Sequence, residues 1–170
     1  MKQKIRNTVK MINNIPDVNF VVRVDGKFET KKSDFYFANK KIVLFALPGA
    51  FTPTCTSYHL PSYEDKYDEF KKIGIDEIYC LSMNDPFVIE FWKKDQKISK
   101  VKFIPDGNGD FTKAMNMISD RSASGMGPRS FRYSMYIDNK KIVKIFKDED
   151  GKFDVSDSGT MLNFLQSMNG

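Results

Sequence analysis

Short apolar runs alternate with amphipathic segments along most of the chain. Residues 41–47 form a strand-like run bounded by turn residues, which predicts a central strand buried on both faces. The segment 56–73 places apolar side chains at helical spacing, and Gly74 stands where a helix commonly ends. An apolar run over 77–83 predicts the next strand. The pattern therefore indicates a strand–helix–strand unit, which is typical of a partly parallel sheet.

The alternation continues to the end of the chain. Asp85 followed by Pro86 is typical of a helix start, and we expect this helix to reach about Gln96. Nearer the N-terminus, an Asp-Gly pair between two apolar runs predicts a β-hairpin over 20–30. The other expected elements are a short strand over 101–104, a short helix over 111–117, a hairpin of strands 133–137 and 142–146 turning at Asp138-Asn139, and a last helix capped by Ser158 and ending near Met168.

This order of elements predicts an α/β fold. Alternating strands and helices imply crossover connections, a mixed central sheet and helices on both faces, and the closing hairpin adds antiparallel strands. The chain shows no internal repeat, low-complexity tract or linker. We therefore expect residues 1–170 to form a single thioredoxin-like domain with an N-terminal β-hairpin extension.

Composition narrows the classes of function. The chain has no apolar run near 18 residues and no apolar segment after its basic N-terminus, so we expect neither a membrane span nor a secretory signal. The net charge of +5 comes mostly from lysines interleaved with acidic residues, which argues against nucleic acid as a partner. Two cysteines among 170 residues fit a reducing, cytoplasmic location better than a disulfide scaffold.

The candidate chemistry lies where the central strand meets the following helix. A turn with two prolines and a glycine delivers Thr52 and then Cys55 to the head of that helix. Unpaired backbone N–H groups and the helix dipole favour the thiolate there, and the thiolate is the nucleophilic form. The alternative is that Cys55 is a small buried hydrophobic residue. The motif is T-x-x-C, whereas a thioredoxin would carry C-x-x-C.

The segment from Pro48 to Cys55, PGAFTPTC, followed by His59-Leu60-Pro61, resembles the active-site segment of the peroxiredoxins in the type II or peroxiredoxin 5 branch. Residues 80–85 and 127–135 match as well, and the resemblance runs from about 16 to 165. It implies a thiol-specific peroxidase that reduces hydrogen peroxide and alkyl hydroperoxides through a cysteine sulfenic acid. It implies no cofactor and no metal.

The resemblance also implies roles for individual residues. Cys55 is the peroxidatic nucleophile, Thr52 hydrogen-bonds the thiolate and the peroxide, and Pro48 shields the site from water. Arg132 is the expected active-site arginine, and Arg129 competes for that role. Because alternate strand positions point to opposite faces, the register of the following apolar residues favours Arg132. Arg129 is then left to a surface ion pair or to support of the loop.

His59 and Cys80 have competing interpretations. His59 lies one helical turn beyond Cys55, so it is either a packing and hydrogen-bonding residue beside the site or half of a papain-like Cys–His pair. Cys80 stands in an apolar strand, which favours a buried structural thiol over a redox role. Some members of this branch carry a resolving cysteine at a place matching Ser156, and none stands there or anywhere beyond Cys80.

The resemblance without a resolving cysteine implies a 1-Cys mechanism and an external reductant. Glutathione, with or without glutaredoxin, is the expected partner, and thioredoxin is the next. We also expect a homodimer, formed near the active site around Phe51 and Phe87. Two other functions remain open on the same fold: a general thiol–disulfide oxidoreductase, disfavoured by the missing C-x-x-C, and a non-enzymatic redox sensor or holdase.

Overall fold

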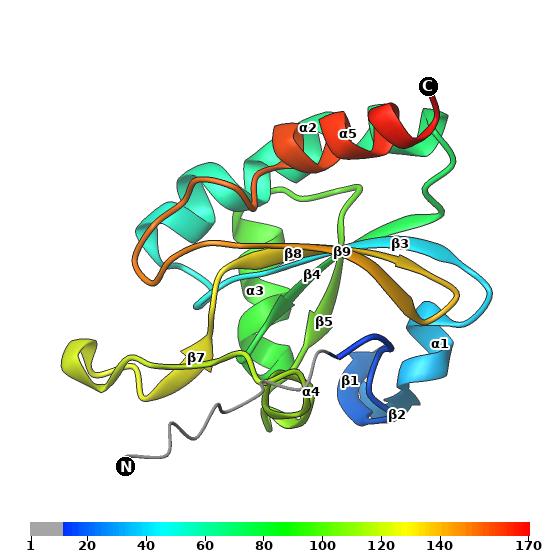
Figure 1. Cartoon of the computed structure of the whole chain (residues 1–170). Helices are drawn as coiled ribbons and strands as arrows, with labels where there is room; N and C mark the ends of the chain where they lie inside the picture. The colour runs from blue at the N-terminus through cyan, green and yellow to red at the C-terminus, as the bar shows by residue number, and fades with distance from the viewer. Residues whose placement is uncertain (1–11) are drawn as a thin grey trace, which may run out of the picture.

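The computed structural model describes residues 12–170, and its centre is a five-stranded mixed sheet (Figure 1). The strand order is β5-β4-β3-β8-β9. Strands β3, β4 and β5 are parallel, β8 is antiparallel to β3, and β9 is antiparallel to β8. The central strand is buried from its second residue to its last, because both faces of the sheet are covered. The strands are β3 (Lys41–Ala46), β4 (Glu77–Ser82), β5 (Lys102–Pro105), β8 (Tyr133–Asp138) and β9 (Lys141–Lys147).

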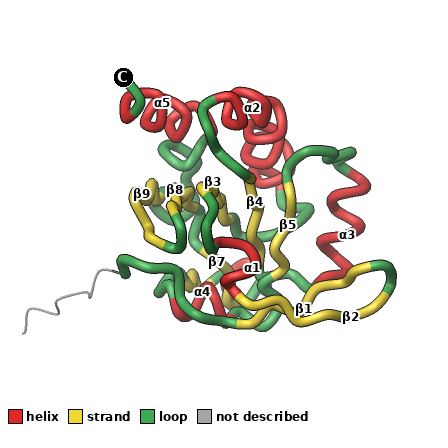
Figure 2. The backbone as a smooth tube through the Cα atoms, turned by 90° about the vertical axis from the view of Figure 1, so that its right-hand side faces the viewer, coloured by secondary structure: helices red, strands yellow, loops and turns green. Residues whose placement is uncertain are grey.

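Helices and a hairpin cover the two faces of this sheet, as the sequence predicted (Figures 1 and 2). On one face lie α2 (Leu60–Lys72) and α5 (Ser158–Met168), with α3 (Pro86–Asp95) beside the β5 edge. The other face carries the hairpin of β1 (Asn19–Val24) and β2 (Lys27–Lys32), together with α1 (Ser33–Phe37) and α4 (Asp110–Ala114). Each face buries its own apolar cluster, with Val43 and Phe45 of β3 in one and Ile42 and Leu44 in the other.

Most local predictions agree with the structure. The β1–β2 hairpin turns at Asp25 and Gly26, both with positive φ, as a primed turn requires. Asp85 caps α3 by accepting hydrogen bonds from the backbone N–H groups of Phe87 and Val88. Gly74 adopts φ 95° just after the end of α2, a conformation that favours glycine.

Several details differ from the predictions. The cap of α5 is Asp157, whose carboxylate accepts from Thr160 N, and not Ser158. The last hairpin turns at Asn139 and Lys140, both with positive φ, so β8 extends through Asp138. The short elements that were not predicted are α1, the 3₁₀ helix η2 (Ser122–Ser124) and the paired strands β6 (Ile118–Asp120) and β7 (Pro128–Ser130), because three to five residues carry no readable periodicity.

The sheet register determines what meets at one end of β3. Because β8 runs antiparallel to β3, the first residue of β8, Tyr133, pairs with the last residue of β3, Ala46. The residue before β8 therefore lies beside the loop that leaves β3. Over residues 12–170, no helix combines the length and the apolar character that a bilayer crossing needs.

Candidate active site

The loop after β3 is held from several sides. Pro48 and Gly49 are buried, and the N–H of Ala50 donates to Asn84 Oδ1 at 3.0 Å. Phe51 has φ +62°, which is rare for a bulky side chain and costs on the order of 1 kcal/mol or more. Such strain persists only where the surrounding contacts enforce it, so the turn is built to present the residues that follow.

Those residues begin a helix that contains a π-turn. The first helical hydrogen bond runs from Thr56 N to Thr52 O at 3.0 Å, which places Cys55 in the first turn. Residues Cys55–His59 are π-helical, with the N–H of Leu60 donating to Cys55 O. Pro61 explains this widening, because it has no N–H to donate and its ring crowds the carbonyl four residues before it.

The side chain of Arg132 bridges two residues of this turn. Its Nη2 donates to Cys55 Sγ at 3.3 Å, and its Nη1 donates to His59 Nδ1 at 2.9 Å. Cys55 and His59 are four positions apart, so they share one helix face and match the fork of a guanidinium. Arg132 is 7% exposed and Cys55 is 1% exposed, so this contact is formed largely out of water. The geometry therefore holds the positive charge of the Arg132 guanidinium beside the sulfur of Cys55.

His59 is a neutral hydrogen-bonding residue. Burial, and then the charge of Arg132, lower its pKa from 6.5 to about 3. Arginine can only donate, so Nδ1 is the acceptor and Nε2 carries the proton, which it donates to Ser156 O at 3.1 Å. The Nδ1 lone pair is therefore already used. This arrangement fits the supporting role expected for His59 and leaves no base for a papain-like pair.

The remaining predicted site residues lie around the same loop. Thr52 Oγ1 donates to Gly49 O at 2.7 Å, so its proton points to the loop and not to the Cys55 sulfur as expected, and its lone pairs are free to accept. Arg129 donates from Nε to Met126 O, and its Nη1 lies against Gly49, where an added Cβ would be 2.9 Å away. Arg129 has no ion pair within the described residues. Of the two alternatives left for it, its contacts therefore favour support of the active-site loop over a surface ion pair.

Arg129 and Arg132 do not lie on one continuous strand, so the alternation expected for these two positions is wrong. In the structure Arg129 belongs to β7, which pairs with β6, and Phe131 and Arg132 lie outside any strand before β8 begins at Tyr133. Arg132 reaches Cys55 because of the β3–β8 register described above.

Cys80 is a fully buried thiol in the middle of β4, opposite Phe45 of β3. Burial raises its pKa well above the ordinary value, and the neighbouring charge of Cys55 raises it further, although Arg132 opposes the shift. A thiol in such an environment is a poor nucleophile. Both cysteines are free, and residues 12–170 contain no cluster of His, Cys, Asp and Glu suited to a metal ion.

Four further residues complete the site, and the sequence alone predicted no role for them. Asn84 holds the loop through Ala50, as described above. Ser156 offers its carbonyl to His59 and also to Tyr63, whose hydroxyl donates at 2.8 Å. The ring of Phe153 lies 5.6 Å from the guanidinium carbon of Arg132 and packs against His59. No local sequence pattern marks these contacts, because they join segments that are far apart in the chain, by 34 positions for Asn84 and Ala50 and by 97 for Ser156 and His59.

Comparison with known proteins identifies the family of the chain. The Redoxin family model matches residues 12–162. A peroxiredoxin of Synechocystis sp. is 44% identical, over 89% of this chain and 89% of its own length. Among solved structures, the Plasmodium falciparum antioxidant protein, a 1-Cys peroxiredoxin, is 36% identical with a TM-score of 0.86, over 91% of this chain and 98% of that one. Peroxiredoxin 5 from Alvinella pompejana is 33% identical with a TM-score of 0.79, over 91% and 96%.

The family match covers nearly the whole described chain, and the fold is the thioredoxin-like one of these structures. The chain therefore belongs to the Redoxin family and is a peroxiredoxin of the type II, peroxiredoxin 5-like branch, a thiol-dependent peroxidase.

Proposed function

We propose that this chain reduces hydrogen peroxide and alkyl hydroperoxides through Cys55, and that an external thiol completes each cycle. The contact of Arg132 Nη2 with Cys55 Sγ carries this proposal. The thiolate attacks the terminal peroxide oxygen, so an S–O bond forms and the O–O bond breaks. Cys55 becomes a sulfenic acid, and the leaving oxygen takes a proton to give water or an alcohol.

The surrounding residues supply what this step needs. Negative charge moves from sulfur to the leaving oxygen, and the guanidinium of Arg132 is already positioned to stabilise it. Thr52, whose proton is held by Gly49 O, accepts a hydrogen bond from the peroxide hydroxyl and orients it. Pro48 is buried in the loop and excludes water from the sulfur. Arg129 and His59 support this set through the contacts described above.

The proposed resolution follows a 1-Cys mechanism. The chain has one other thiol, Cys80, which is completely buried in a central strand. A first glutathione attacks the sulfenic sulfur, forming a mixed disulfide and releasing water. A second glutathione or a glutaredoxin thiolate then attacks the glutathione sulfur of that disulfide, so a new disulfide forms and Cys55 leaves as the thiolate. Thioredoxin is the second candidate reductant. This fits a reducing cytoplasm, where the two free thiols persist.

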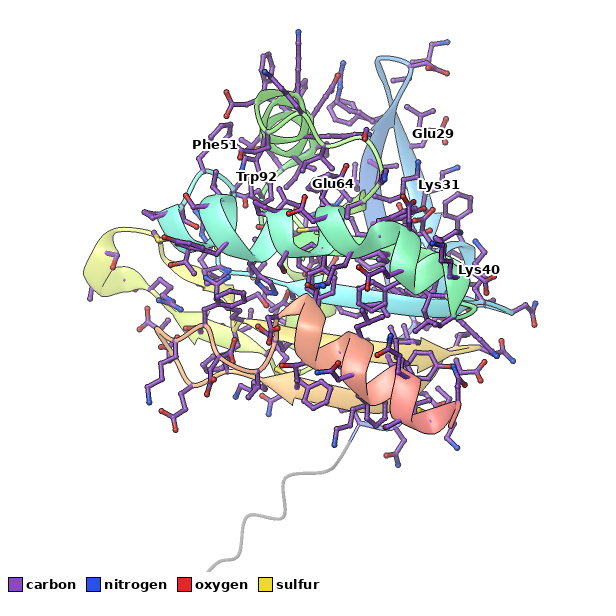
Figure 3. All side chains as sticks on the ribbon, turned by 90° about the horizontal axis from the view of Figure 1, so that it is seen from above. Glu29, Lys31, Lys40, Phe51, Glu64 and Trp92 are labelled. Carbon is purple, nitrogen blue, oxygen red and sulfur yellow. The ribbon has the colours of Figure 1, made fainter. Side chains whose placement is uncertain are left out.

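We also propose a homodimer. Phe51, Phe87 and Phe91 are 52%, 47% and 66% exposed, and large aromatic side chains are enriched at protein interfaces. Figure 3 shows Phe51 beside the N-terminal end of α2, on the side where Trp92 lies. Two copies that meet through these rings would bury apolar surface next to the active-site loop.

A peroxide-consumption assay tests the proposal. The purified chain is given hydrogen peroxide or an alkyl hydroperoxide together with glutathione, glutathione plus glutaredoxin, or thioredoxin with its reductase. We expect turnover with the glutathione system and none with Cys55→Ser. Turnover with thioredoxin alone would contradict the proposed reductant. A chain that reacts with peroxide once but accepts no reductant would instead be a redox sensor.

A further inference from the structure

A continuous series of buried hydrogen bonds leads away from Cys55. Arg132 joins Cys55 to His59, and His59 donates to the carbonyl of Ser156. The hydroxyl of Ser156 donates to Asp148 Oδ2 at 2.5 Å. Arg132 is 7% exposed, Asp148 is 3% exposed, and His59 and Ser156 are fully buried. The series ends at the carboxylate of Asp148, which takes no direct part in the reaction proposed above.

Asp148 holds residues 154–156 in place and is itself anchored to the backbone of Arg132. Its Oδ1 accepts from the N–H groups of Val155 and Asp154 at 2.6 and 3.1 Å, which fixes the strap of residues 154–156. Its own N–H donates to Arg132 O at 3.0 Å. Asp148 forms no ion pair within the described residues, so its buried charge is satisfied by these donors alone. One residue therefore ties the backbone of Arg132 to the strap that faces His59.

The position of the Ser156 carbonyl decides the state of His59. As long as that carbonyl accepts from Nε2, the proton stays on Nε2 and Nδ1 keeps a lone pair for Arg132. If the strap moves, His59 loses this acceptor, and its ring can turn or take the other tautomer. Nη1 of Arg132 then loses its partner, and Nη2 is no longer held on the sulfur.

We propose that Asp148 is a positioning residue for the reaction at Cys55. It acts through Ser156 and His59 and keeps the guanidinium of Arg132 on the sulfur. The inference rests on the proposed function of Cys55 and Arg132. Catalytic groups lose rate when the residues that orient them are lost, even if every reacting group is still present.

A charge effect and a positioning effect have opposite signs here. If Asp148 acted only through its negative charge, Asp148→Asn would favour the Cys55 thiolate, because a nearby like charge disfavours an anion. Alkylation of Cys55 by iodoacetamide would then become faster. If Asp148 positions Arg132, the same substitution loosens the guanidinium, and alkylation becomes slower.

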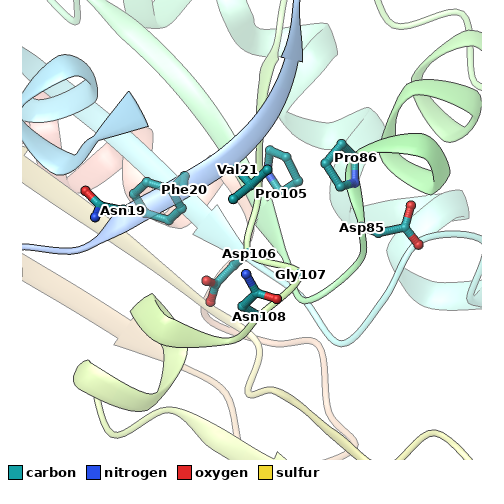
Figure 4. A pocket seen from close by; sticks show the side chains of 9 residues that line it. All are labelled: Asn19, Phe20, Val21, Asp85, Pro86, Pro105, Asp106, Gly107 and Asn108. Carbon is teal, nitrogen blue, oxygen red and sulfur yellow. The ribbon is translucent and has the colours of Figure 1, made fainter. Parts of the chain in front are cut away.

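Asp106 provides a matched control. It is also 3% exposed, and it likewise accepts from two backbone N–H groups and one hydroxyl, those of Phe111 and Thr112. Figure 4 shows it in the wall of a cleft that Asn19, Pro86 and Asn108 also line. Asp106→Asn therefore removes a similarly buried and hydrogen-bonded carboxylate, whose hydrogen bonds reach neither Arg132 nor His59.

The experiment compares the two variants by stopped-flow oxidation of Cys55 with hydrogen peroxide. Trp92, the single tryptophan, is the reporter, because its Nε1 donates to Thr56 Oγ1 next to Cys55. We expect Asp148→Asn to slow oxidation and alkylation by roughly tenfold. Asp106→Asn should stay within about twofold of wild type, although both substitutions lower the melting temperature. Equal rates for the two variants, or faster alkylation of Asp148→Asn, would overturn the proposal.

Nitrogen-15 NMR of His59 gives a second readout that a merely structural role would not move. His59 is the only histidine in the chain, so its ring signals are unambiguous. We expect the Nε2–H tautomer in wild type and in Asp106→Asn, and a mixed or rotated state in Asp148→Asn. An unchanged state of the His59 ring in Asp148→Asn would contradict the proposed positioning role of Asp148. If that variant does not fold, Ser156→Ala, which keeps the carbonyl and removes the hydroxyl link, takes its place with the same expected outcomes.

The two proposals fail in different ways. If wild-type Cys55 does not react with peroxide, the proposed function is wrong, and the NMR comparison still decides whether Asp148 sets the state of His59. If wild type reacts and Asp148→Asn reacts equally fast, only the positioning role is wrong.

Discussion

The Nη2 atom of Arg132 lies 3.3 Å from the sulfur of Cys55, although 77 positions separate the two residues in the chain. The contact depends on the antiparallel pairing of β8 with β3, which brings the start of one strand to the end of the other. A charged donor so close to a nearly enclosed sulfur acts with little screening by water. In the proposed reaction, the guanidinium is therefore already in place to stabilise the negative charge that moves to the leaving oxygen.

Removing Arg132 is expected to have a much larger effect than removing Arg129. Arg132→Ala should slow the reaction of Cys55 with hydrogen peroxide by roughly a hundredfold, or about 3 kcal/mol, as for other lost donors that stabilise developing charge. Arg132→Lys should restore little, because an ammonium cannot bridge Cys55 and His59 as the planar fork does. Stopped-flow rates measure both. Arg129→Ala is the control, and a loss as large as that of Arg132→Ala would reverse the assignment.

The buried neutral His59 should make the fold sensitive to acid. Its pKa is about 3 in the folded chain, against 6.5 for an exposed histidine. Between these values the unfolded chain binds a proton that the folded chain does not, so stability falls as the pH drops from about 6.5 toward 3. The slope approaches about 1.4 kcal/mol per pH unit. Urea unfolding at several pH values should show this slope in wild type and a smaller one in His59→Gln. Identical slopes would mean that His59 is protonated in the folded chain.

The sequence predicted the parts of this protein whose signals are local. The central strand at 41–47, the turn of the first hairpin at Asp25-Gly26 and the cap at Asp85 all follow from short patterns of residues. The placement of Cys55 in the first turn of a helix follows in the same way. The π-turn does not, because it depends on how the helix accommodates Pro61 inside a packed site.

The long-range contacts of the site could not be read from the sequence. His59 was identified by its spacing from Cys55, but its state depends on the carbonyl of Ser156, 97 positions away. In the sequence, Asp148 is one acidic residue within a run of charged residues, and only the fold shows that it is buried and accepts three hydrogen bonds. Such residues gain their roles from chain topology, which no local pattern encodes.

Gly49 and Arg129 should be energetically coupled. A Cβ at position 49 would lie 2.9 Å from Arg129 Nη1, so Gly49→Ala must displace that side chain from the active-site loop. We expect a loss of about 1 kcal/mol in the free energy of unfolding, as for other overpacked sites. Removing the long side chain in Gly49→Ala/Arg129→Ala should recover much of this loss. Urea unfolding of the two single variants and the double variant measures the coupling. Strictly additive effects would show that Arg129 does not support the loop.

The fate of oxidised Cys55 tests the 1-Cys mechanism. With glutathione present, mass spectrometry of peroxide-treated protein should show one glutathione adduct, on the Cys55 peptide. Without any thiol, excess peroxide should carry Cys55 from sulfenic to sulfinic acid. Cys80 cannot intervene without local unfolding, because it is fully buried in β4 and its raised pKa keeps it a thiol. Cys80→Ser should therefore keep most of the turnover, whereas Cys55→Ser should lose it. Rapid, quantitative formation of a Cys55–Cys80 disulfide would contradict the external reductant while leaving Cys55 as the residue that attacks the peroxide.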